Sequence, residues 1–239
     1  RAYRESLGVA ERLAAADPDG ARSRLEGGLA ASLPAEWAAW TWAQVGRQSA
    51  VRLQPEAAAD FRRAEAAALR AKGGVHFTDD TLAWQVRAAL RATPTDWRMV
   101  RTAIDAMSEA ERADATWTYW VARAHLALAG DDEIGESERA QARQQLVAIA
   151  GQMSFYGKLA AEELGHELRL PARPVPLTAE ERAAAAGHAG LARALHLIGL
   201  GLRSEGNREW NFSLRGMSDR QLLAAAQLAC DRTVWDRCI

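Results

Sequence analysis

The sequence has little that would favour β-structure. Alanine is abundant, valine and isoleucine are scarce, and no stretch of about four to eight residues alternates convincingly in β-branched and aromatic residues. This lack excludes a fold built on sheets. We therefore expect an all-α protein.

Long apolar runs and a net charge are also missing. The run from Leu191 to Leu202 is interrupted by Arg and His, and it is shorter than the roughly 20 residues that cross a bilayer. The chain has 30 Lys and Arg against 31 Asp and Glu, a formal net charge of -1. No chain-wide field would attract nucleic acid or an anionic membrane. We expect no membrane span and no nucleic-acid partner.

The first residue is not methionine, and no signal-like apolar core follows it. Residues 1–15, RAYRESLGVAERLAA, have instead the pattern of a helix. We expect the chain to be a mature or truncated piece, and its sequence gives no targeting information of its own.

Cysteine is rare, with only Cys230 and Cys238 near the end. On one continuous helix they would be about 12 Å apart, beyond the roughly 7 Å that the Cα atoms of a disulfide allow. A bridge therefore requires a turn between them, for which the segment DRTVWD is the candidate; without it both thiols stay free. No second Cys or His pair lies nearby at ligand spacing, so we expect no metal site here.

Recognisable catalytic and cofactor motifs are lacking as well. The histidines are scattered and form no HExxH pair; they are His76, His125, His166, His188 and His196. The glycines of GLGLRSEG follow no strand and precede no lysine, as a phosphate loop would require. No serine lies in a G-x-S-x-G elbow. We expect no catalytic, cofactor-binding or metal-ligating residues.

Helix-stop signals recur at short intervals along the first hundred residues. Each carries proline at a first helical position, or Asp or Thr at an N-cap. They are ADPDGA (16–21), SLPAEW (32–37), LQPEAA (53–58), KGGVHFTDD (72–80) and ATPTDW (92–97). The segments between them have about 12 to 18 residues, the length of ordinary helices. The spacing predicts a series of antiparallel helix pairs.

Two of the predicted helices resemble each other. Residues 82–92 and 118–128 superpose at an offset of 36 residues, which matches Trp84 with Trp120 and Arg87 with Arg123. This offset is within the range of helical-hairpin repeats, whose units bury their apolar faces by stacking. We predict an α-superhelix.

A proline-rich stretch divides the chain. Residues 168–181, LRLPARPVPLTAEE, contain three prolines within six residues, and proline fixes φ and removes a backbone donor. We predict an α-superhelical domain over 1–170, an extended connector over 171–180 and a small helical domain over 181–239.

The segment SFYGKLAAEELG, residues 154–165, carries two adjacent glutamates. Glu162 and Glu163 could form an acid and base pair, but neighbours on a helix point about 100° apart. The predicted buried face consists of Phe155, Tyr156, Leu159, Ala160 and Leu164. We therefore expect both carboxylates to face water, with Ser154 as N-cap and Gly165 as the left-handed helix stop.

Tryptophan is more frequent than usual, with nine in the chain, and Trp37, Trp40 and Trp42 lie within six residues. Such rings can stack on sugars or bases. At helical spacing, core packing is the more common role.

Several of these segments resemble soluble lytic murein transglycosylases of Gram-negative bacteria. Trp117, Tyr119, Trp120 and Ala122 match a W-x-Y-W-x-A helix. An F-Y-G-x-L-A-A-x-x-L-G helix is matched by Phe155, Tyr156, Gly157, Leu159, Ala160, Ala161, Leu164 and Gly165. A linker-domain pattern is matched by Leu195, Gly201, Leu202, Glu205, Glu209 and Trp210. The resemblance is strongest over residues 82–239.

The resemblance implies a superhelix and a linker domain that hold a separate, C-terminal lysozyme-like domain in the periplasm. That domain cleaves the β-1,4 bond between N-acetylmuramic acid and N-acetylglucosamine in peptidoglycan and leaves a 1,6-anhydro end. Its signature is an E-S pair followed by G-x-M-Q. The pair occurs here at Glu136 and Ser137, but no G-x-M-Q follows. We expect Glu136 to lie at a helix N-terminus, where a carboxylate suits the dipole.

We thus expect a scaffold that contacts peptidoglycan glycan strands and does not cleave them by itself, without cofactors. The alternative is a tetratricopeptide-like scaffold for a protein partner, which would need several repeats of about 34 residues. A third hypothesis is a free-standing enzyme that uses Glu162 or Glu163.

Overall fold

The computed structural model describes residues 12–167 and 172–238, and all regular elements within these ranges are helical. The all-α prediction is confirmed. The chain divides into two compact units, Arg1–Arg169 and Leu170–Ile239. The helix predicted at the N-terminus falls mostly on residues 1–11, outside the described residues, while residues 12–16 are helical.

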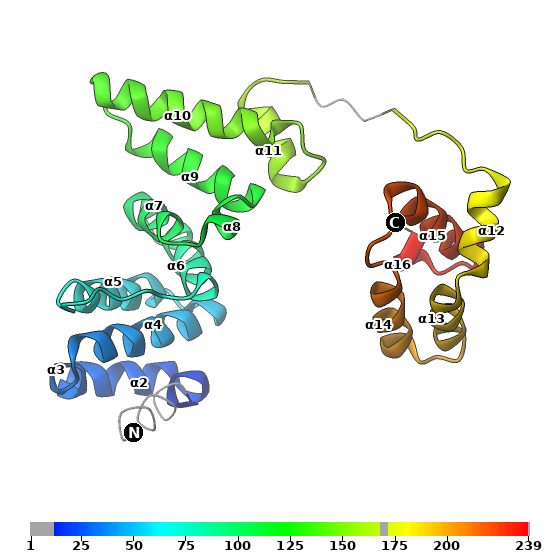
Figure 1. The fold of residues 1–239 in the computed structure, drawn as a ribbon. Helices are drawn as coiled ribbons and strands as arrows, with labels where there is room; N and C mark the ends of the chain where they lie inside the picture. Colours follow the sequence, from blue (N-terminus) through cyan, green and yellow to red (C-terminus); the bar gives the residue numbers. More distant parts are fainter. Residues whose placement is uncertain (1–11, 168–171, 239) are drawn as a thin grey trace. The chain divides into compact units, whose positions relative to one another are not determined.

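The first unit is a stack of helix pairs, which Figure 1 shows running in series from α2 to α11. Neighbouring helices pack in chain order, α4 on α5, α6 on α7 and α9 on α10, and each pair packs on the next. The helices are α2 (Pro18–Arg24), η1 (Leu25–Leu29), α3 (Ala30–Ser32), α4 (Ala35–Val51), α5 (Ala57–Ala68), α6 (Asp79–Arg91), α7 (Trp97–Asp105), α8 (Glu109–Arg112), α9 (Ala115–Leu128), α10 (Glu133–Ala150) and α11 (Phe155–Glu163).

Three helix starts in this unit follow the predicted capping signals. Asp17, Thr78 and Asp96 each accept a backbone N–H at the start of α2, α6 and α7. Pro18 occupies the first helical position of α2. Pro34 instead stands one residue before α4, at its N-cap, and Pro55 stands two residues before α5. Their predicted places at first helical positions are therefore wrong. The φ of Pro34, -53°, suits either position.

The buried positions of α6 and α9 repeat at the predicted offset. In α6 the buried residues are Thr81, Leu82, Ala83, Gln85, Val86, Ala88 and Ala89. In α9 they are Trp117, Tyr119, Val121, Ala122, Ala124 and His125. Each buried position of α9 corresponds to a buried position of α6, although the residue types differ. The two helices thus occupy equivalent places in successive pairs.

Ion pairs join each helix pair to the next. Four such pairs are Arg22 with Asp60 (38 residues apart in sequence), Arg47 with Asp80 (33), Arg62 with Asp96 (34) and Arg101 with Glu138 (37). These separations are each close to one repeat. The charged side chains therefore follow the same stacking as the core.

Tryptophans lie mainly between the helices of this unit. Trp42 is buried in the core. Trp40 is partly buried, and its ring packs edge-on against Phe77 with the two ring centroids 5.4 Å apart. Trp37 is also partly buried. The more common role of such tryptophans, core packing, fits Trp42 fully and the other two in part.

The second unit is a small helical domain with its own core. Its helices are α12 (Ala179–Gly187), α13 (Ala189–Gly199), α14 (Arg203–Ser213), α15 (Asp219–Asp231) and α16 (Trp235–Cys238). Helix α13 packs on α14, and α15 packs on α12 and α16. The core is built around Leu191, Ala194, Trp210, Ala225 and Ala229. Small residues on these helices let the large ring of Trp210 lie between them.

The connector leads into this unit without regular secondary structure. Residues 172–178 have no helical structure, and α12 begins at Ala179, two residues before the predicted start of this domain at 181. The reason is a capping box, in which Thr178 and Glu181 bond each other's backbone N–H. Arg220 of α15 holds the connector by donating to the carbonyl oxygens of Val175 at 2.6 Å and Pro176 at 3.2 Å.

Candidate functional site

A series of aromatic rings crosses the last helices of the first unit. Ring centroids lie 6.5 Å apart for Trp97 and Trp120, 5.3 Å for Tyr119 and Trp120, and 5.5 Å for Tyr119 and Tyr156. Phe155 ends the series, 5.1 Å from Tyr156 and nearly perpendicular to it. Spacings of 4.5 to 7 Å are those of favourable aromatic pairs. Trp97, Trp120 and Tyr156 are half-buried and Phe155 is exposed, whereas Tyr119 is buried. We call Trp120, Tyr156 and Phe155 the aromatic surface.

Polar groups lie directly beside the aromatic surface. The indole Nε1–H of Trp120 donates to the hydroxyl of Tyr156 at 3.2 Å. Glu163 accepts hydrogen bonds from the Tyr119 hydroxyl, at 3.2 Å, and from the Arg123 guanidinium. Burial raises the pKa of Tyr119 above its ordinary value. The site therefore offers ring faces, a carboxylate and a guanidinium in one place.

One sequence prediction for this segment needs correction. Phe155 was expected on the buried face, but it is 69% exposed at the first position of α11. Glu162 and Glu163 are both exposed, as expected. Glu163 also pairs with Arg123 of α9, a contact that the sequence did not predict. Ser154 caps α11, and Gly165 has a φ of 69°, both as predicted.

The other matched residues of α9 and α11 pack between helices. Trp117, Tyr119, Gly157, Ala160 and Ala161 are buried, while Trp120, Tyr156 and Leu159 are half-buried. At Gly157 a Cβ atom would lie 2.3 Å from the carbonyl oxygen of Gln152, so the glycine allows a close approach of backbone. The role of these residues as a mark of the family stays a prediction.

The matched residues of α14 do not form a cluster of their own. Trp210 is 2% exposed in the core, Glu209 accepts from Arg193 of α13 at 2.6 Å, and Glu205 is exposed. Glu136 lies in the first turn of α10, as predicted from the helix dipole. Within the described residues, no group of three His, Cys, Asp or Glu side chains could hold a metal ion.

One polar cluster was missed at the sequence level. His125 of α9 is buried, and its Nδ1 contacts the carboxylate of Glu138 in α10, which also accepts from Arg101 of α7 at 3.2 Å. The three residues come from three helices. No local spacing links them, so the sequence carried no signal for the cluster.

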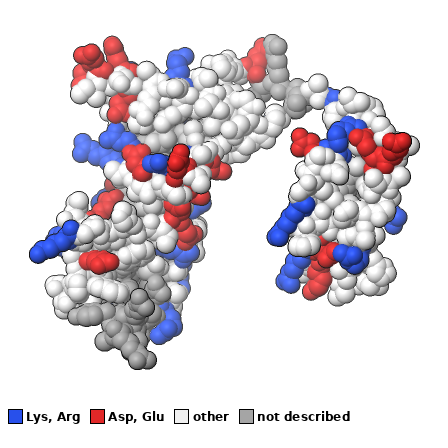
Figure 2. Space-filling view, in the orientation of Figure 1, with Lys and Arg blue, Asp and Glu red and all other residues white. Residues whose placement is uncertain are grey.

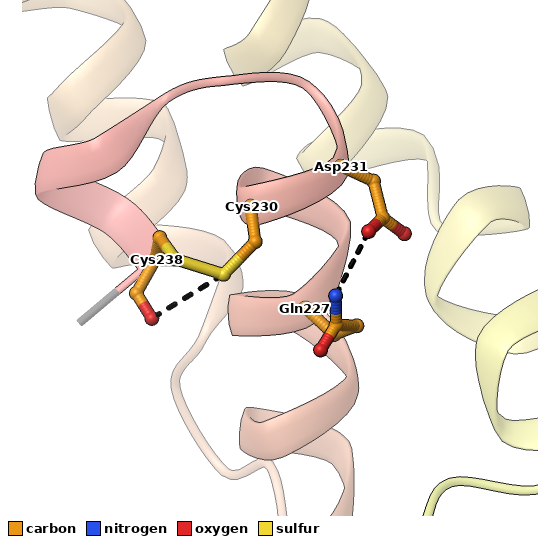
Figure 3. Close-up of a disulfide and its surroundings, with 4 residues drawn as sticks. All are labelled: Gln227, Cys230, Asp231 and Cys238. Carbon is orange, nitrogen blue, oxygen red and sulfur yellow. Dashed lines mark hydrogen bonds between the residues drawn. A yellow bond between two sulfur atoms is a disulfide. The ribbon is translucent and has the colours of Figure 1, made fainter.

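Cys230 and Cys238 form a disulfide, with Cα atoms 4.7 Å apart (Figure 3). The required turn lies within the segment DRTVWD: α15 ends at Asp231, Thr233 has a φ of 58°, and α16 follows. Of the two possibilities left open by the sequence, the bridge with a turn is the one observed.

Charges are mixed over the surface. Figure 2 shows basic and acidic side chains interspersed in each unit, while the surface over α11 and the adjoining end of α10 is largely uncharged in that view. No helix within the described residues is long and apolar enough to cross a membrane.

Comparisons with known proteins add to this description. Residues 184–239 match the family model of the soluble lytic murein transglycosylase L domain. The search among curated proteins found no match.

The structure resembles those of an inactive mutant of the lytic transglycosylase Slt from Pseudomonas aeruginosa (TM-score 0.59, 23% identity, covering 95% of this chain and 34% of that one) and of the 70 kDa soluble lytic transglycosylase from Escherichia coli (TM-score 0.59, 20% identity, 98% and 35%). It also resembles a complex of the 70-kDa soluble lytic transglycosylase with bulgecin A (TM-score 0.55, 19% identity, 98% and 35%). The chain spans about a third of these proteins.

The fold defines an all-helical protein of stacked helix pairs followed by a small helical domain. Residues 184–239 of its second unit match the L domain of the soluble lytic murein transglycosylases, and the chain has a helical fold similar to that of two lytic transglycosylases. The resemblance drawn from the sequence is thereby confirmed. Nothing in the comparisons favours a tetratricopeptide scaffold instead.

Proposed function

We propose that this chain is the non-catalytic scaffold of a periplasmic lytic murein transglycosylase, which binds peptidoglycan glycan strands and carries a lysozyme-like catalytic domain in the full-length protein. The observation that carries the proposal is the L-domain match over residues 184–239, inside a chain that has the helical fold of two such enzymes. The full-length protein would cleave the bond between N-acetylmuramic acid and N-acetylglucosamine.

The disulfide supports the periplasmic location. Disulfides persist in oxidising compartments such as the bacterial periplasm and are rare in the cytosol. The bridge between Cys230 and Cys238 joins α15 to the short helix α16 in the second unit.

The aromatic surface is our candidate for glycan contact. Phe155, Tyr156 and Trp120 offer ring area on which the C–H faces of a pyranose can stack, as apolar rings favour amphipathic partners. Arg123 and Glu163 lie beside them and provide a donor and an acceptor for hydroxyl and acetamido groups. The ion pair has no net charge, which suits uncharged N-acetylglucosamine.

Retention on purified sacculi tests the function. We expect the chain to co-sediment with sacculi and to release no 1,6-anhydromuropeptides from them. Absence of retention would contradict glycan binding, and any 1,6-anhydro product would show that an active site is present after all. Retention on a peptide partner that sacculi do not compete for would favour the tetratricopeptide-like alternative.

A matched pair of variants tests the aromatic surface. Phe155→Ala removes the ring that is 69% exposed, and Phe212→Ala removes a ring of the second unit that is 64% exposed. We expect Phe155→Ala to weaken binding of chitotetraose by about 1 kcal/mol, the scale of one aromatic contact, and Phe212→Ala to leave it unchanged. Equal effects of the two variants would remove the aromatic surface from the proposal.

A further inference from the structure

The second unit has a pocket of about 340 Å³ between α12, the start of α13 and α15. These three helices lie next to one another in Figure 1, and α12 packs on both others. The volume is at the lower end of the range of roughly 300 to 1,000 Å³ that is usual for small-ligand sites. The pocket is separate from the aromatic surface, which belongs to the first unit.

The floor of the pocket is aliphatic. Ala185, Leu191 and Ala224 are buried and line it, and the half-buried side chain of Met217 completes the wall. None of the lining residues is Phe, Tyr or Trp. The pocket therefore offers no large ring face on which a pyranose could stack. Small methyl groups fit it, because each buried CH₂ gains about 0.8 kcal/mol in an apolar environment.

The rim of the pocket is polar and held in place. Arg220 donates to Glu181 through Nε at 2.7 Å and through Nη2 at 2.5 Å. Glu181 also accepts the backbone N–H of Thr178 at 2.8 Å. These bonds hold the pKa of Glu181 at about 2, so it remains a carboxylate at neutral pH. The carboxylate and guanidinium are thereby fixed before any ligand arrives.

Two further rim residues present hydrogen-bonding groups. The ring Nδ1 of His188 accepts the backbone N–H of Leu191 at 3.3 Å, so in neutral His188 the proton is on Nε2, which is a donor. The side-chain oxygen of Gln221 accepts the N–H of Ser218 at 2.8 Å, and its amide NH₂ is a donor. Both side chains line the pocket and are exposed. Donors and carboxylate acceptors therefore surround an aliphatic floor.

We propose that this pocket binds a short peptide that contains alanine, whose methyl group lies on the floor and whose amide groups bond the rim. The inference rests on the proposed function, under which the peptide is a stem of peptidoglycan. The backbone of the connector already lies at this rim, because Arg220 donates hydrogen bonds to the carbonyl oxygens of Val175 and Pro176. A peptide matches the pocket because it alternates small apolar groups with donors and acceptors.

A pocket-filling variant with a neighbouring control tests this proposal. Ala184 lines the pocket and is exposed, whereas Ala183 is exposed on the same helix and does not line it. Ala184→Leu places three more carbons at the pocket, and Ala183→Leu places them outside it. Neither site is buried, so both variants should fold.

The ligand arm uses the free stem tetrapeptide L-alanyl-γ-D-glutamyl-diaminopimelyl-D-alanine and, separately, chitotetraose. We expect the tetrapeptide to shift the NMR methyl signal of Met217 saturably, and chitotetraose to leave this signal unchanged. Ala184→Leu should weaken tetrapeptide binding roughly tenfold or more, the scale of a misfit in an apolar pocket. Ala183→Leu should bind as the unmodified chain does.

Three results would overturn the proposal: no saturable shift with the tetrapeptide, the same loss in both variants, or a shift of Met217 with chitotetraose alone. Sacculi distinguish a failure of this proposal from a failure of the proposed function. If the chain is retained on sacculi but ignores the tetrapeptide, the pocket proposal is wrong and the function stands. If the chain binds neither, both are wrong.

Discussion

Arg22 holds Asp60 through two nitrogen atoms, with Nε 2.9 Å from Oδ1 and Nη2 2.8 Å from Oδ2. The Asp60 carboxylate is fully buried and also accepts from Ser49 at 3.1 Å and from Arg63 at 3.1 Å. Arg22 lies on α2, Ser49 on α4, and Asp60 and Arg63 on α5. The carboxylate therefore joins three helices of the first unit.

Loss of this carboxylate should destabilise the start of the first unit. In Asp60→Ala the guanidinium of Arg22, whose side chain is 11% exposed, keeps its charge without its main partner. We expect a cost of about 3 to 5 kcal/mol, as for other broken buried ion pairs. Native-state hydrogen exchange of α2, α4 and α5 measures it. Asp80→Ala breaks the more exposed pair with Arg47 and should cost below about 1 kcal/mol; equal costs would contradict the special role of Asp60.

Gly157 should tolerate no side chain. Its added Cβ would overlap the carbonyl oxygens of Gln152 and Ile149, at 2.3 and 2.8 Å. We expect Gly157→Ala to destabilise the packing of α10 on α11 by about 1 to 3 kcal/mol, the usual cost of overpacking, measured by hydrogen exchange in these helices. Gly151→Ala is the control, because no atom lies within 4 Å of its added Cβ and its φ is -81°. If Gly157→Ala left hydrogen exchange in α10 and α11 unchanged, close packing at Gly157 would not be needed for stability.

Glu65 should make the protein more stable as the pH falls from neutral. Burial raises the pKa of Glu65 above its ordinary value of 4.5, and the Asp96 carboxylate raises it further. The folded state therefore binds this proton more tightly than the unfolded state, so its stability decreases as the pH rises through the raised pKa. The Gln85 amide donates to Glu65 at 2.6 Å, and a glutamine oxygen can accept that bond.

We accordingly expect Glu65→Gln to be more stable than the unmodified chain at pH 7.5 and to lose part of the gain at pH 5. Thermal unfolding at the two pH values measures the difference. Glu162→Gln replaces an exposed carboxylate and should show no such difference. A gain for Glu65→Gln that does not depend on pH would contradict the assignment.

Reduction of the disulfide should loosen the end of the second unit. The bridge closes a loop with a sequence separation of 8 residues, and the chain-entropy model assigns such a loop roughly 2 to 3 kcal/mol. Cys230→Ser should therefore increase hydrogen exchange in α16 and leave α2 to α11 unchanged. Dithiothreitol should reproduce the effect in the unmodified chain and add nothing in the variant. Detection of two free thiols in the native chain would refute the bridge.

Local features of the fold could be predicted because they depend on neighbours in the sequence. The caps at Asp17, Thr78, Asp96 and Ser154 are bonds between residues a few positions apart. The repeat between residues 82–92 and 118–128 also follows from local pattern, since equivalent helices need the same buried positions.

Contacts between helices could not be predicted in the same way. Phe155 fitted an apolar stripe, but a stripe gives only the direction of a side chain and does not show where the neighbouring helix ends. The pairing of Glu163 with Arg123, and of His125 with Glu138, depends on how α9 lies against α10 and α11.

The sequence by itself determined the helical class, several helix N-caps and the family resemblance, because composition, capping and motif spacing are local properties of the chain. Only the tertiary structure decided that Cys230 and Cys238 meet, that Asp60 is buried among arginines, and that α12, α13 and α15 leave a pocket. Each of these depends on the packing of helices from distant parts of the sequence, and spacing along one helix carries no record of that packing.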